Sequence, residues 1–68
     1  MRERIKKWIK DNREYIWREI KKIIKHLRDA AKDRQVLMIS ALASQLQERV
    51  GMLDLLFFLE SFLEKEGD

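Results

Sequence analysis

Residues 52–63 read MLDLLFFLESFL, and this stretch decides how the rest of the chain has to be arranged. Nine of its twelve residues are large and apolar, the exceptions being Asp54, Glu60 and Ser61. As a helix it would be apolar nearly all round, and such helices are usually buried on every side. It would be only about 18 Å long, whereas the hydrocarbon core of a membrane is about 30 Å thick. We therefore expect other segments, or a partner, to cover it.

The composition predicts an all-α domain. The chain has 68 residues, no Cys, no Pro and only two Gly, and it is rich in residues that favour helices. A single domain this small needs stabilisation beyond its small hydrophobic core. Without disulfides, the remaining options are regular helix packing and self-association. We therefore expect a small three-helix bundle completed by self-association. Enrichment in Lys and Glu is typical of hyperthermophile proteins, and it also fits a designed helical protein. The composition leaves both sources open.

The first helix is predicted over residues 3–32, because its apolar residues fall on one stripe at about 100° per residue. One site could interrupt it. Asp11, followed by Asn12, stands three residues before Glu14, which is the spacing of a capping box. We expect a continuous or merely kinked helix, because the stripe keeps its phase across this site. The stripe consists of Ile5, Ile9, Ile16, Ile20, Ile23 and Leu27.

A turn is predicted near Lys32–Gln35, before a second helix over residues 35–49. The second helix has its own apolar face, and continuing the first helix would shift the apolar stripe by about 120°. A straight helix could not bury both stripes against one partner. Asp33 is the expected N-cap of the second helix.

A second break is predicted at Gly51. The apolar faces before and after this residue differ in phase by about 170°, and glycine commonly ends helices because it tolerates the left-handed conformation. We therefore expect a third, separate helix over residues 52–65.

The predicted third helix carries more apolar surface than a domain of this size can cover. Part of that surface is therefore expected to bind a second copy of the chain or another protein. The expected function is that of a non-enzymatic protein–protein interaction or self-assembly module, with helix one contributing part of the interface. The predicted partner-binding residues are Met52, Leu53, Leu56, Phe57, Phe58, Leu59 and Phe62.

Nucleic-acid binding is the alternative. Residues 1–34 contain thirteen Lys and Arg against six Asp and Glu, a net charge of +7, whereas residues 35–68 contain two against six, a net charge of −4. Clustered cations suffice for phosphate contacts. Residues 39–46, ISALASQL, resemble the first half of a helix-turn-helix, although the helix that follows has no basic or amide residues for a DNA groove. The candidate phosphate-binding residues are Arg18, Lys21, Lys25 and Arg28.

Several other functions are not expected. His26 is the only histidine, and it has no Ser, Cys or carboxylate in a fixed catalytic relation to it. We therefore expect neither enzymatic activity nor a metal site, cofactor or small-molecule substrate. The N-terminal residues are charged throughout and lack the apolar core of a signal peptide. We expect a cytoplasmic protein that does not use the membrane surface.

Overall fold

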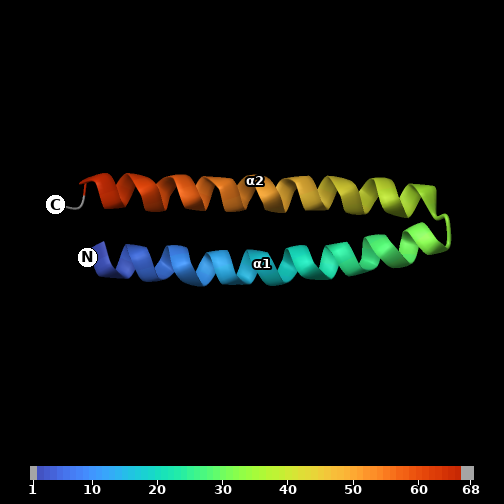
Figure 1. Cartoon of the computed structure of the whole chain (residues 1–68), viewed down its shortest axis with the longest axis horizontal. Helices are drawn as coiled ribbons and strands as arrows, with labels where there is room; N and C mark the ends of the chain where they lie inside the picture. Colours follow the sequence, from blue (N-terminus) through green and yellow to red (C-terminus); the bar gives the residue numbers. More distant parts are fainter. Residues whose placement is uncertain (1, 67–68) are drawn as a thin grey trace.

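The computed structural model describes residues 2–66 as two antiparallel helices (Figure 1). Helix α1 spans Arg2–Lys32 and helix α2 spans Val36–Glu66. They lie side by side along their whole length and form a helical hairpin with extents of 52 × 14 × 12 Å. The all-α prediction is confirmed. The three-helix prediction is wrong, because the predicted second and third helices are one helix.

The turn between the helices is closed by backbone hydrogen bonds. The amide of Gln35 donates to the Ala30 carbonyl at 3.0 Å, and the amide of Arg34 donates to the Ala31 carbonyl at 3.2 Å. Arg34 has a φ of 54°. These bonds and this left-handed residue together form a Schellman motif, which satisfies carbonyls that the end of a helix leaves unpaired.

The break predicted near Lys32–Gln35 is thus confirmed, but the role predicted for Asp33 is wrong. The amide of Asp33 donates to the Asp29 carbonyl at 3.2 Å, so Asp33 belongs to the end of α1. Helix α2 begins three residues later, at Val36.

Helix α1 passes through Asp11 and Asn12 without a break. The side-chain amide of Asn12 donates to the Trp8 carbonyl at 2.8 Å, one turn earlier. Asp11 accepts from Lys7, also one turn earlier, at 3.2 Å. Both side chains therefore act within a continuous helix, as the unbroken apolar stripe predicts.

The core is the seam between the two helices. Along each helix, the seam positions alternate three and four residues apart, which is the spacing of an antiparallel coiled coil. Two buried clusters lie along this seam, and Leu46 packs against both. The seam residues of α1 are Ile9, Arg13, Ile16, Ile20, Ile23, Leu27 and Ala30, and those of α2 are Ile39, Leu42, Leu46, Arg49, Leu53, Leu56, Glu60 and Leu63.

The seam explains why α2 does not break at Gly51. The pattern of seam residues runs through this position without a change of phase, so the two halves of α2 pack on α1 as one element. Gly51 is exposed and has no positive φ. A glycine inside a helix costs only about 1 kcal/mol relative to alanine. The phase difference between the two apolar faces is real, but it is accommodated by leaving much of each face exposed.

Candidate interaction surface

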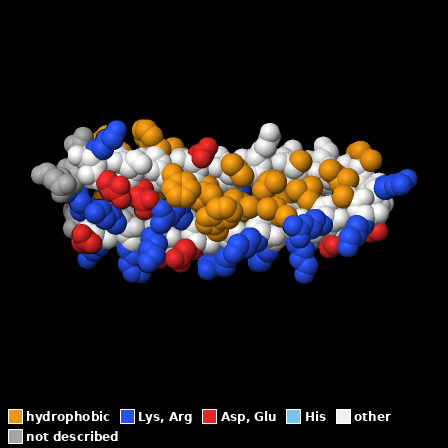
Figure 2. Space-filling view, in the orientation of Figure 1, with side chains coloured by type: hydrophobic (Ala, Val, Ile, Leu, Met, Phe, Trp, Pro, Cys, Tyr) orange, Lys and Arg blue, Asp and Glu red, His pale blue; other side chains and the backbone are white. Residues whose placement is uncertain are grey.

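One face of the hairpin is apolar on both helices. In antiparallel helices, residues that directly follow a seam residue lie on the same face of the pair. Figure 2 shows one face of the hairpin, where hydrophobic side chains gather along the line between the helices. We define the ladder face as the six apolar residues that directly follow every second seam residue between the middle of the hairpin and the turn. It consists of Trp17, Ile24 and Ala31 of α1 and Ala43, Val50 and Phe57 of α2, all of which are exposed.

Each ladder-face residue of α1 can be matched with the ladder-face residue of α2 that lies opposite it. Arg13 of α1 meets Glu60 of α2 across the seam, with Nη1 2.6 Å from Oε1. Counting from this pair toward the turn, up the sequence along α1 and down the sequence along α2, places Trp17 about level with Phe57. The same count places Ile24 beside Val50 and Ala31 beside Ala43. The side chains are therefore largest in the middle of the hairpin and smallest next to the turn.

Apart from Glu14 of α1, which lies beside Trp17, the charged residues that border the ladder face have opposite signs on the two helices. One heptad before Trp17 is Lys10, and it is level with Glu64 of α2. Farther from the seam on the same face, Lys21 of α1 is level with Asp54 of α2. None of these four side chains forms an ion pair within residues 2–66.

A shallow hollow lies on the ladder-face side of α2. It measures about 540 Å³ and is lined mainly by small or amide side chains, with Ala43 and Val50 at the ladder positions. Since Ser40, Ser44 and Gln47 complete its lining together with Leu46, a helix could approach this part of α2 closely.

A second exposed apolar surface lies on the opposite face, in the half of the hairpin that holds the termini. We name it the terminal patch. Toward the turn, the same side of α1 presents Glu19, Lys22 and His26, so the patch does not extend the length of the molecule. The terminal patch consists of Ile5, Trp8 and Tyr15 of α1 and Met52, Leu55, Leu59 and Phe62 of α2.

The predicted partner-binding residues are divided between four environments. Leu53 and Leu56 are 7% and 6% exposed and belong to the core against α1, so they are not accessible to a partner. Phe57 lies on the ladder face, and Phe58 points away from the seam. Met52, Leu59 and Phe62 belong to the terminal patch.

The sequence-based prediction did not assign Trp17, Ile24 and Val50 to an interface. Their signal is a spacing of seven residues, which becomes informative only when the seam positions are known.

The four candidate phosphate-binding residues are all exposed on α1. Lys21 and Arg28 lie toward the ladder face, whereas Arg18 and Lys25 point directly away from α2. None of the four forms an ion pair with another residue in the described part of the chain.

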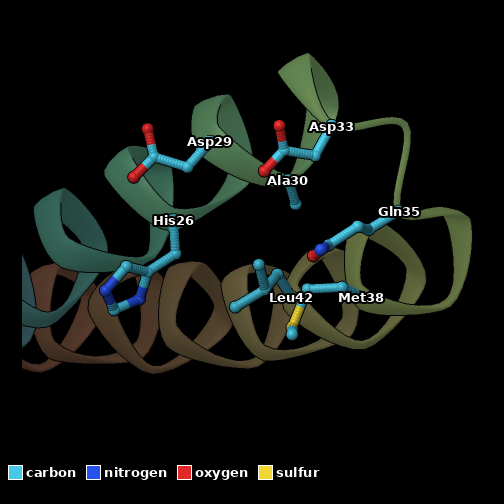
Figure 3. Close-up of a pocket in the computed structure, with 7 residues that line it drawn as sticks. All are labelled: His26, Asp29, Ala30, Asp33, Gln35, Met38 and Leu42. Carbon is cyan, nitrogen blue, oxygen red and sulfur yellow. The ribbon is translucent and has the colours of Figure 1, made fainter.

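A pocket of about 350 Å³ lies beside the turn (Figure 3). His26 reaches from α1 toward α2, and Met38 and Leu42 form an apolar wall on the α2 side. The carboxylates of Asp29 and Asp33 stay on the α1 side, apart from the His26 ring. Within residues 2–66, no group of three His, Cys, Asp or Glu side chains could hold a metal ion.

The hairpin exposes more surface than its mass requires. A compact monomer of 8.3 kDa is expected to expose roughly 4,600 Å². This chain exposes 5809 Å². The surplus of roughly 1,200 Å² is larger than the roughly 800 Å² that each partner buries in a stable protein interface.

Comparisons with protein-family models, curated proteins and solved structures found no match for this chain. Over residues 2–66, neither helix combines the length and the apolar character that a membrane crossing requires.

Proposed function

We propose that this chain is a non-enzymatic self-assembly module that associates through apolar surface of both helices. The observation that carries the proposal is the number of large apolar side chains left in water by a two-helix fold. Trp17 is 47% exposed, Phe57 43%, Phe58 65% and Leu55 61%. Removing apolar surface from water contributes about 25 cal/mol per Å², so covering a surface of this size strongly favours association.

Stability supports the same proposal. Two helices that share a single seam bury few side chains completely, and Ile9 is the largest that is almost wholly enclosed. Small helical domains with so little core are commonly stabilised by oligomerisation. The free energy of folding is then coupled to the free energy of association.

The dependence of thermal unfolding on protein concentration tests this coupling. A folded state that is an oligomer becomes more stable as concentration rises, by mass action. We expect the Tm to increase steadily from low to high micromolar concentration. A Tm that does not change over this range would show that the folded state is a monomer.

The basic surface of α1 supports a second candidate function, nucleic-acid binding. Helix α1 contains twelve Lys and Arg against five Asp and Glu, a net charge of +7. Arg18, Lys21, Lys25 and Arg28 lie together without carboxylate partners, which leaves them able to contact phosphates. The salt dependence described in the Discussion tests this function separately.

A further inference from the structure

We propose that a second copy of the chain packs on the ladder face, related by a two-fold axis parallel to the length of the hairpin. The two turns then lie at the same end of a four-helix bundle. This inference rests on the proposed self-assembly function and specifies its surface, partner and symmetry.

The ladder face is the better of the two apolar surfaces for this contact because its positions beside the seam are apolar on both helices from the middle of the hairpin to the turn. Its six positions extend from the middle of the hairpin to the turn and directly adjoin the seam residues. On the opposite face, Asn12, Glu19 and His26 of α1 occupy the corresponding positions beside the seam. A second copy packed there would have to cover these polar side chains, which costs free energy unless each finds a partner.

Two symmetric arrangements can stack the ladder face on a second copy. In both, the same patch is used on each chain, as a closed dimer requires. An axis along the hairpin places α1 over α2 of the second copy, with the turns together. An axis across the hairpin places α1 over α1 and α2 over α2, with the turns at opposite ends.

Charge favours the axis along the hairpin. Helix α1 has a net charge of +7, whereas α2 contains two Lys and Arg against five Asp and Glu, a net charge of −3. Stacking α1 on α2 therefore pairs helices of opposite charge. Stacking α1 on α1 brings Lys10, Lys21 and Arg28 of one copy against those of the other, and like charges at an interface disfavour that arrangement.

The axis along the hairpin also fixes which residues meet, because the rotation leaves every residue at its own level. Lys21 then faces Asp54 of the second copy, and Lys10 faces Glu64 of the second copy. These are the oppositely charged side chains that have no ion-pair partner within the described residues.

The same rotation builds complete core layers. Trp17 and Phe57 of both copies form one layer, and Ile24 and Val50 form the next. Near the turn, Ala31 of one copy meets the hollow beside Ala43 of the other. Four helices with apolar residues at the seam and at every second position directly after it form a bundle core of the usual kind.

Distances between spin labels test the symmetry. Single Cys variants Arg4→Cys, Arg18→Cys and Lys32→Cys place a label on one side of α1, at one end, in the middle and at the other end. Double electron–electron resonance on each labelled protein measures the distance between the label and its equivalent in the second copy. With the axis along the hairpin, the three distances are similar. With the axis across it, shifting one copy along the other shortens the distance between the labels at one end of α1 and lengthens the distance at the other end. At least one of the distances measured at positions 4 and 32 therefore exceeds roughly 40 Å.

Charge reversal tests the contact independently of the labels. We expect Lys21→Asp and Asp54→Lys each to raise the dimer dissociation constant several-fold, and the double variant to restore it. Both residues are exposed, so neither change should prevent the hairpin from folding, which circular dichroism verifies. A double variant no tighter than the single variants would overturn the proposed pairing.

A matched pair of substitutions tests the face. Val50→Asp, on the ladder face, should shift the protein to monomer, whereas Leu55→Asp, on the terminal patch of the same helix, should leave the dimer intact. The opposite ranking would overturn the choice of face. A parent protein that is monomeric throughout would overturn the proposed function itself. A dimer in which the labels at position 4, or those at position 32, lie more than roughly 40 Å apart would overturn only the symmetry.

Discussion

Arg13 and Glu60 form an ion pair across the seam, 47 residues apart in sequence, with Nη1 of Arg13 donating to Oε1 of Glu60 at 2.6 Å. The Arg13 guanidinium also lies over the Phe57 ring, 5.2 Å from its centroid. Both charged groups occupy seam positions that are otherwise mostly apolar. A polar pair at such positions is a known means of fixing the register of paired helices.

Removing one member of this pair should destabilise the hairpin more than removing both. Arg13→Leu or Glu60→Leu alone leaves a partly buried charge without its partner, at a cost of about 1–3 kcal/mol. The double change replaces the pair by an apolar contact and should recover most of that loss. Urea unfolding of the four proteins gives the coupling free energy. Additive losses in the double variant would mean that the two side chains do not interact.

Gly51→Ala should stabilise the protein by about 0.5–1 kcal/mol, because alanine restricts the unfolded chain and favours the helix. A Cβ at this position would have no atom within 4 Å. The free energy of unfolding, measured at one protein concentration, provides the check. A loss of stability would indicate that α2 is interrupted at residue 51.

Gly51 also shows what the sequence could and could not predict. Comparing the phases of neighbouring apolar faces located the turn at Lys32–Gln35 correctly. The same comparison failed at Gly51, because it assumes that each apolar face must be buried within the chain. Here Val50, Met52 and Leu55 remain exposed, and the actual seam includes Arg49 and Glu60, which an apolar pattern does not detect.

The candidate surface was predictable in kind but not in position. Residues 52–63 are too apolar for one small domain to cover, and the structure leaves Phe57, Phe58 and Phe62 exposed. The sequence could not indicate that, among the predicted partner-binding residues, Leu53 and Leu56 are the ones buried against α1. That choice depends on the register of the hairpin, which the Arg13–Glu60 contact now specifies.

Arg34→Gly should stabilise the turn by about 1 kcal/mol. Arg34 has a φ of 54°, a conformation that costs an L-residue roughly 1–2 kcal/mol and costs glycine nothing. Arg34→Ala is the matched control, since it removes the charged side chain but keeps the Cβ. Thermal unfolding should show a gain for the glycine variant alone. Equal effects from both substitutions would assign the change to the side chain instead of the backbone.

Changing Arg18, Lys21, Lys25 and Arg28 together to Gln tests the nucleic-acid alternative. If this surface only faces solvent, the parent should show no more than weak, salt-sensitive affinity for DNA or RNA. If it binds phosphates, the logarithm of affinity falls steeply with the logarithm of salt concentration, and the variant flattens the slope by roughly one unit per lost contact. Fluorescence anisotropy at several salt concentrations separates the two outcomes.

The most direct test of self-assembly is the mass of the protein in solution, measured by sedimentation equilibrium at several concentrations. We expect a species of twice the 8.3 kDa chain mass at micromolar concentration, dissociating on dilution. A mass that stays at 8.3 kDa up to high micromolar concentration, with the helices intact by circular dichroism, would contradict the proposal that the exposed apolar surface is covered by a second copy.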